Sequence, residues 1–478
     1  MIYWLGRMVA RSLQIVLLPI FTAYLSPADY GELSILGISI DVLALVLSFQ
    51  LPVAIYKFWA KEETEQGRHR VFGSAMLVTM IAPTILLLPG YVWADYFSNL
   101  LGMESHANLL RLALVEGQLG MIITVVMTEM RVRDESRRFS SWEVFQRVGI
   151  GLLSVLLVAG FGLGIWGMFI AHVAVFACIT LWLLPPFLKR IGLCFDVEIM
   201  KNMFRYALPL VPSAVAMAAV HSADRFFLQR MVGLEATGLY AIGYKFGMLV
   251  NILVTGPFFL LWEPKRFAIA NEEGAGAKYG QIFTYLLVLT VFVAMALTGL
   301  AGEIVKIMTA PAYWESYTLV ALVAWSYVFF ALSSVVSVGL FVHHKTAASA
   351  WIVFVAFAAN MLGNVLLIPH YGAYGAAFAT LVSFVLLFVC NLLFSQRYIA
   401  IQFEMKKIFL LIGLVLASLT LMALVATGNL FADIGLKAVV LVCFLGVLYA
   451  LHFFDALRIP ERLAGFRCSL RTRATKGE

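Results

Sequence analysis

Long apolar runs alternate with short polar breaks along almost the whole chain. Each run holds about 20 mainly apolar residues, the length that an α-helix needs to cross the roughly 30 Å hydrocarbon core of a membrane. Turn residues mark the breaks, as at Gly162–Gly164 and His370–Tyr371. The pattern predicts an all-α polytopic membrane protein. We expect about fourteen transmembrane helices, two sets of six and a final pair, at residues 4–24, 33–56, 71–93, 108–130, 142–161, 165–187, 203–222, 236–261, 281–301, 318–342, 349–368, 372–395, 407–427 and 434–453.

The two sets of six helices carry matching segments. LSPADYGELSILG in the first half resembles VGLEATGLYAIGY in the second, with Gly31 and Gly238 in register. GLGIWGMFIAHV likewise resembles HYGAYGAAFATL, with Gly167 aligned to Gly375 at nearly the same offset. A constant offset predicts a duplicated bundle, an architecture that places a transport path between the halves. We therefore divide the chain into two six-helix lobes, two additional helices and a basic tail, at residues 1–200, 201–400, 401–455 and 456–478.

Composition and charge agree with a membrane location. Hydrophobic residues make up 62% of the chain and charged residues 13%, and the mean hydropathy is +0.93. The net charge of +7 comes from basic residues gathered in alternate loops, whereas the other loops hold only Arg225, Arg230, Lys306 and Lys437. By the positive-inside rule both termini are cytoplasmic. The positive charge thus reflects topology, and we expect no nucleic-acid partner.

The sequence carries no legible catalytic, cofactor or metal motif. It has no Gly-rich phosphate loop followed by Lys and Ser or Thr. Its five cysteines are scattered without metal-site spacing, and its one histidine cluster, His343-His344, has no neighbouring carboxylate or cysteine. Every predicted loop is short, which argues against an enzyme with a large catalytic loop outside the membrane. We therefore expect a protein that is not an enzyme and that has no cofactor.

Ionisable residues inside the first two predicted spans are the first candidates for a functional site, since such groups are costly in lipid. Arg7 and Arg11 share one stripe of the first span. Arg7 is close enough to the cytoplasmic edge to extend to water, whereas Arg11 lies about 12 Å inside. Asp41 in the second span has a comparable depth, so it can pair with Arg11 or line a cavity.

The seventh and eighth spans hold a second group of candidates. Lys245 lies about 13 Å from the outer edge. Asp224 and Arg225 follow His221 at helical spacing, which fits either a local salt bridge or a cavity group. Tyr240 and Tyr244 share one helix face, and they either stack against a sugar or pack against another helix. In the fourth span, Glu116 lies nearly a turn and a half from Arg111, which fits either a structural pair of these two residues or a transport role.

Three segments resemble the bacterial polysaccharide repeat-unit flippases of the Wzx type. The most specific is ALPLVPSAVAMAAVHSADRFFLQRMVGLEATGLYAIGYKFG, at Ala207–Gly247. The opening LPIFTAYLSPADYGELSILG is similar to the N-terminal span pair of these proteins, and LLIPHYGAYGAAFATLVSFV is similar to their late hairpin. The resemblance covers residues 1–400 approximately. It is clearest at Asp224, Arg225, Tyr244 and Lys245, which lie inside the shared motif.

The resemblance implies a fold, a substrate and partners. The family shares a superfamily with MATE multidrug exporters and lipid II flippases, in which two six-helix lobes form a V and helices 1, 2, 7 and 8 line a central cavity. Its members move an undecaprenyl-diphosphate-linked glycan to the outer leaflet of the inner membrane by alternating access, and a polysaccharide polymerase complex is a candidate partner. Cationic cavity residues are thought to meet the diphosphate, here Arg7, Arg11 and Lys245.

Two alternatives stay open at this stage. A MATE-type small-molecule exporter would need a cavity dominated by acidic residues that bind hydrophobic cations. A membrane enzyme of polysaccharide assembly would form new glycosidic bonds. The sequence names neither the sugar repeat nor the coupling ion.

Overall fold

The computed structural model describes residues 16–102, 106–425, 427–451 and 453, and every regular element within these ranges is helical. The N-terminal lobe and the short helix before it comprise α2 (Leu18–Tyr24), α3 (Pro27–Leu47), α4 (Leu51–Lys61), α5 (Glu65–Val92), α6 (Ala94–Leu100), α7 (Ala107–Val132), α8 (Ser136–Val155), η1 (Leu156–Gly160), α9 (Gly164–Ile191) and α10 (Val197–Ala207). The C-terminal lobe comprises η2 (Leu208–Leu210), α11 (Val211–Ser222), α12 (Asp224–Met231), α13 (Leu234–Gly247), η3 (Asn251–Thr255), α14 (Gly256–Ala270), α15 (Ala275–Gly299), α16 (Ala301–Met308), η4 (Pro311–Ser316), α17 (Tyr317–Val336), α18 (Val338–Val342) and α19 (Thr346–Ser395). A final hairpin follows, α20 (Met405–Leu424) and α21 (Leu430–Ala450).

Twelve helices of the described ranges are long and apolar enough to cross a membrane, so the protein is an all-helical multi-pass membrane protein. The predicted number of fourteen is not confirmed. Part of the predicted first span lies outside the described residues. The predicted spans 349–368 and 372–395 fall within α19, where two helices meet at Gly372, whose φ of 54° and ψ of −129° are non-helical. Glycine reaches such a conformation at little cost, and the break coincides with the turn expected from the sequence.

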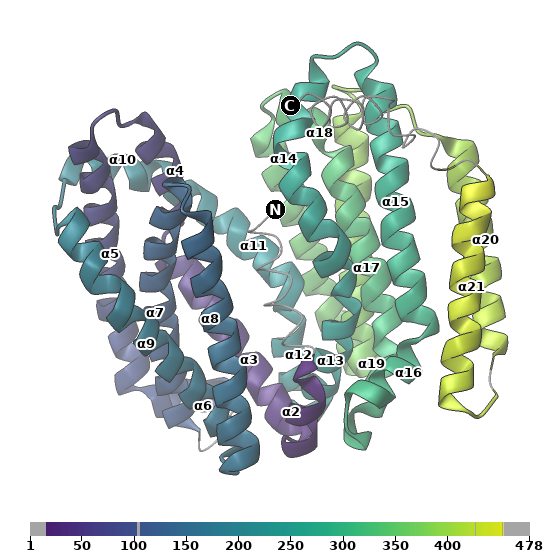
Figure 1. Ribbon diagram of the computed structural model, residues 1–478, viewed down its shortest axis with the longest axis horizontal. Helices are drawn as coiled ribbons and strands as arrows, with labels where there is room; N and C mark the ends of the chain where they lie inside the picture. Colours follow the sequence, from purple (N-terminus) through teal and green to yellow (C-terminus); the bar gives the residue numbers. More distant parts are fainter. Residues whose placement is uncertain (1–15, 103–105, 426, 452, 454–478) are drawn as a thin grey trace, which may run out of the picture.

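The two lobes diverge toward one end of the molecule and converge at the other, where α2, α3, α12 and α13 lie (Figure 1). The hairpin of α20 and α21, shown in yellow, stands at the outer edge beside α15. The divergent end carries the basic residues in the last turns of α4 and α9, among them Lys61 and Lys189, and we call it the basic end.

The convergent end is built around the two glycines that the internal repeat aligns. Gly31 on α3 and Gly238 on α13 lie where these helices cross. A Cβ atom added to Gly31 would overlap the carbonyl oxygen of Leu234, and one added to Gly238 would overlap that of Pro27. Only glycine permits the two backbones to approach this closely. The repeat-related helices therefore pack against each other through their equivalent residues.

Hydrogen bonds around this crossing join the same end of the lobes. Tyr313 Oη donates to the carbonyl oxygen of Leu25 at 2.8 Å, and the backbone N–H of Ala310 donates to Thr22 Oγ1 at 3.1 Å. Leu25 and Thr22 are 3% exposed. Packing and hydrogen bonds thus close the convergent end.

The final hairpin is joined to the C-terminal lobe by an ion pair. Lys437 Nζ on α21 lies 2.5 Å from Glu303 Oε1 on α16, and both side chains are largely buried. At the basic end, the backbone N–H of Gln402 donates to the carbonyl oxygen of Gly276 at 3.0 Å. The hairpin is therefore held to the lobe at both ends.

Candidate functional site

A buried polar network joins α12, α13 and α17 inside the C-terminal lobe. Tyr240 Oη donates a hydrogen bond to Asp224 Oδ2, and Asp224 Oδ1 accepts one from the backbone N–H of Arg225 at 2.8 Å. The Arg225 guanidinium lies 3.6 Å from the Asp224 carboxylate and 4.2 Å from the centre of the Tyr244 ring. The hydroxyl oxygens of Tyr244 and Tyr327 are 2.8 Å apart. These contacts compensate a charge pair whose burial alone would be costly.

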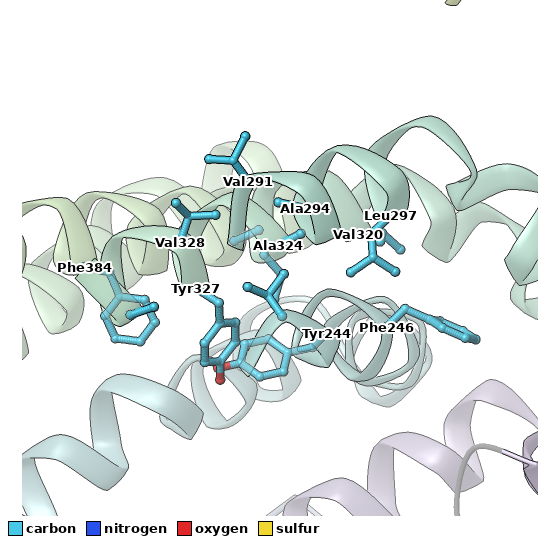
Figure 2. Packing of buried hydrophobic residues seen from close by; sticks show 14 of the residues in the cluster. Tyr244, Phe246, Val291, Ala294, Leu297, Val320, Ala324, Tyr327, Val328 and Phe384 are labelled. Carbon is cyan, nitrogen blue, oxygen red and sulfur yellow. The ribbon is translucent and has the colours of Figure 1, made fainter. Parts of the chain in front are cut away.

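The two tyrosines that were expected either to stack against a sugar or to pack against another helix are both buried. Tyr240 is 0% exposed and Tyr244 is 3% exposed. Figure 2 shows Tyr244 beside Tyr327, with Val328 and Phe384 close by. In this conformation Tyr244 packs against Tyr327 of α17, and Tyr240 contacts Asp224 of α12. A contact of either ring with a sugar stays a prediction. Asp224 and Arg225 form the local ion pair that was one of their two sequence-based interpretations.

Lys245 lies one residue beyond this network, between the lobes. Its Nζ atom donates to Tyr30 Oη on α3 at 3.4 Å and lies 5.1 Å from the centre of the Tyr30 ring. The ion pairs found within the described ranges do not include Lys245. The lysine is half-buried. It is thus a cation at the seam of the two lobes whose described partner is an aromatic hydroxyl rather than a carboxylate.

The other predicted cations lie outside the described residues. Arg7 and Arg11 both precede residue 16, so their contribution to a cavity and the pairing of Arg11 with Asp41 stay predictions. Asp41 itself is described. It lies on α3 and faces a cavity of the N-terminal lobe.

This cavity, which we call the N-lobe groove, has a volume of about 570 Å³. Residues of α3, α5, α7, α8 and α9 line it, together with Ser48 and Pro52 near the junction of α3 and α4. Its charged and titratable lining residues are Asp41, Glu116, Glu143, Arg131, Arg147 and His172.

The groove rules out one pairing that the sequence suggested. Glu116 does not pair with Arg111: its Oε1 atom lies 2.7 Å from His172 Nδ1 on α9. Arg111 instead contacts Asp95 at 3.2 Å near the convergent end. Helical spacing could not identify His172, because it lies 56 residues from Glu116 in the chain and on another helix.

A second cluster that the sequence did not reveal lies at the basic end. Glu129 is 0% exposed, accepts a hydrogen bond from Arg133 Nε at 2.6 Å and pairs with Arg190 from α9. This cluster links the ends of α7 and α9. Among the described residues, no group of three or more His, Cys, Asp or Glu side chains is arranged to hold a metal ion.

Comparisons with known proteins agree with this geometry. Residues 1–262 match a protein family described as "Polysaccharide biosynthesis protein". No curated protein matches the chain. Several solved structures do match it in fold.

One of these structures is a lipid II flippase MurJ in an inward closed conformation. It has a TM-score of 0.78 and 14% sequence identity, and the match covers 95% of this chain and 99% of that one. An inward-facing multidrug resistance MATE transporter of the MOP superfamily has a TM-score of 0.61 and 14% identity, over 82% of this chain and 94% of that one. An outward-facing multidrug resistance MATE transporter has a TM-score of 0.58 and 15% sequence identity, over 84% of this chain and 95% of that one. At such identities the likeness shows the fold, which is that of MurJ and MATE transporters.

Proposed function

We propose that the chain, which belongs to the family of polysaccharide biosynthesis proteins, is a lipid-linked glycan flippase of the bacterial inner membrane. Its substrate is an undecaprenyl-diphosphate-linked oligosaccharide repeat unit, which it moves from the cytoplasmic to the outer leaflet for surface polysaccharide synthesis. The observation that carries the proposal is the arrangement of the lobes. They meet at one end through the crossing of Gly31 and Gly238 and diverge at the basic end.

This arrangement suits alternating access. The positive-inside rule places the basic end in the cytoplasm, where the lipid-linked substrate is made. The lobes then separate at Gly31 and Gly238 while the basic end closes, so the substrate meets the outer leaflet. Because neither glycine has a side chain, the two helices can separate at this crossing without pulling interdigitated side chains apart. A polymerase complex is a candidate recipient of the exported repeat unit.

The diphosphate is the costly part of the substrate. It carries about two negative charges, and moving it unaided through hydrocarbon costs on the order of tens of kcal/mol. Lys245 contributes a cation at the seam without a described carboxylate partner. We assign Arg7 and Arg11 the same role, while the prenyl chain remains in the lipid between the lobes. Asp224, Arg225, Tyr240 and Tyr244 act indirectly, since their network fixes α12 and α13 and hence the position of Lys245.

A second candidate function is export of small hydrophobic cations. The carboxylates of Asp41 and Glu116 in the N-lobe groove favour it, because such groups attract cations. Cells that produce the protein would then tolerate higher concentrations of tetraphenylphosphonium than cells that produce the Asp41→Asn variant. A flippase gives no such difference.

Complementation tests the proposed function. The chain is produced in strains that lack their own repeat-unit flippase and whose repeat units differ in sugar composition. We expect surface polysaccharide to return in at least one strain and the lipid-linked precursor to stop accumulating. Lys245→Ala, checked for membrane insertion, is the inactive control. Precursor accumulation in every strain, with the protein inserted, would contradict the proposal.

A further inference from the structure

We propose that the N-lobe groove binds the glycan of the substrate and selects neutral or amino sugars over acidic ones. The inference rests on the proposed flippase function and adds to it the site and the chemical class of the sugar. The diphosphate stays with Lys245 at the seam. The two ends of one substrate are thus held by different lobes.

The shape of the groove fits a chain of sugars. Its lining extends along α3 from Leu33 to Ser48 and along α7 from Glu116 to Arg131, each about 22 Å at 1.5 Å per residue. A volume of about 570 Å³ spread over that length makes a narrow groove. Leu33 lies near the convergent end and Arg131 near the basic end, so the groove follows the direction of transport. Such a groove suits a linear oligosaccharide better than a compact drug.

The lining offers the contacts that sugars use. Ser48 and Thr124 supply hydroxyl oxygens that can accept hydrogen bonds, since their protons are donated to backbone carbonyl oxygens of their own turns. The amide of Gln146 both donates and accepts. The half-buried ring of Phe176 supplies an aromatic surface for the C–H face of a sugar ring, whereas Phe139 and Phe169 are buried behind the lining. Directed polar groups among aromatic surfaces are the usual composition of a small-ligand site.

One acceptor in the groove lacks a partner. Glu116 Oε1 is paired with His172 Nδ1 at 2.7 Å, whereas Glu116 Oε2 is buried and has no hydrogen-bond partner among the described residues. A buried acceptor without a donor is unfavourable. A sugar hydroxyl donating to Oε2 would satisfy it, and His172 keeps the carboxylate in place.

The charges of the groove decide the class of sugar. Three carboxylates, Asp41, Glu116 and Glu143, face two guanidinium groups, Arg131 and Arg147, with His172 as the remaining titratable group. The described lining therefore has no excess of positive charge. Uronic acids and diphosphate would meet repulsion from Asp41 and Glu116, whereas hydroxyl and amino groups would not.

Binding to the purified full chain tests the inference. The probes are undecaprenyl diphosphate alone, the same lipid carrying a neutral hexose tetrasaccharide, and that tetrasaccharide with one hexose replaced by glucuronic acid. Native mass spectrometry measures the three dissociation constants. We expect the neutral glycan to tighten binding about tenfold over the bare lipid, and the acidic glycan to lose most of this gain.

Variants separate the groove from the seam. Glu116→Gln and Asp41→Asn should remove most of the glycan gain and leave the bare lipid unaffected, and Asp41→Asn gives a folded alternative if Glu116→Gln is unstable. Lys245→Gln should weaken all three probes alike. Asp95→Asn, a carboxylate of the same lobe that pairs with Arg111 outside the groove, is the matched control.

Two results would overturn the inference while the flippase function stands: a glycan gain that both groove variants retain, or equal binding of the neutral and acidic glycans. Failure of the function itself looks different. The wild-type chain would then bind none of the three probes and would restore export in none of the complementation strains.

Discussion

The glycine crossing at the convergent end provides the sharpest test of alternating access. In Gly238→Ala, the added methyl group overlaps the carbonyl oxygen of Pro27. The obstacle is backbone on both sides, so it cannot be relieved by a side-chain rotation. The helices must move apart. We expect the variant to insert and fold, with its equilibrium shifted away from the state that is closed at this end.

The size of this shift in Gly238→Ala follows from the free-energy cost of overpacking, about 1–3 kcal/mol. A penalty confined to the closed state reduces its population relative to the open state by roughly 5- to 150-fold. Gly31→Ala should have an effect of the same sign, because its methyl group overlaps the carbonyl oxygen of Leu234.

The assay uses a single cysteine at Thr22, in a chain whose native cysteines are replaced. Thr22 is 3% exposed at the closed end. An impermeant thiol reagent added from the outer side should label Thr22→Cys slowly in the parent and several-fold faster in Gly238→Ala. Gly413→Ala is the matched control, since no atom lies within 4 Å of the added methyl group. Equal labelling rates in parent and Gly238→Ala would show that the glycine crossing does not hold this end closed.

Three further predictions concern the buried polar groups and the topology. Asp224→Ala leaves Arg225 buried without its carboxylate partner, so we expect about 3–5 kcal/mol of destabilisation and little folded protein. Tyr244→Phe loses only one hydrogen bond and about 1 kcal/mol of stability. Thermal unfolding in detergent compares the two variants, and equal melting temperatures would contradict this ranking. Lys437→Ala should weaken the attachment of α20 and α21 to the lobe, so we expect proteolysis after Gln402 to be faster than in the parent. An unchanged cleavage rate would show that the ion pair with Glu303 does not hold the hairpin. Cysteines at Ala28 and Glu315 should react with an impermeant reagent in cells whose outer barrier has been opened, while those at Glu62 and Glu135 stay protected; the reverse pattern would invert the topology.

The helices and the repeat could be predicted because runs of apolar residues and similar segments are both visible in the sequence. Apolar runs of about 20 residues predict membrane-spanning helices, and Gly31 aligned with Gly238 through the sequence alone. Their contact was not predictable, since an alignment states equivalence and not proximity. The break at Gly372 also agreed with the turn expected between two spans.

The side-chain partners were predictable only within a helix. Helical spacing identified Asp224 and Arg225 as neighbours but also suggested a pair of Glu116 with Arg111 that does not form, because the true partner His172 comes from another helix. The burial of Tyr244 depends on which helix covers it, and in a membrane protein lipid-facing and helix-facing surfaces have similar hydropathy. The N-lobe groove was not predicted for the same reason, since residues from six helices line it.

Translocation of the lipid-linked glycan in a purified system tests the flippase function directly. The protein is reconstituted into liposomes that carry a fluorescent undecaprenyl-diphosphate-linked oligosaccharide, and the fraction accessible to a membrane-impermeant quencher is followed with time. We expect wild-type protein to equilibrate the lipid between the leaflets, Lys245→Gln to do so far more slowly, and protein-free liposomes not to do so. A wild-type rate equal to that of protein-free liposomes would contradict the flippase function.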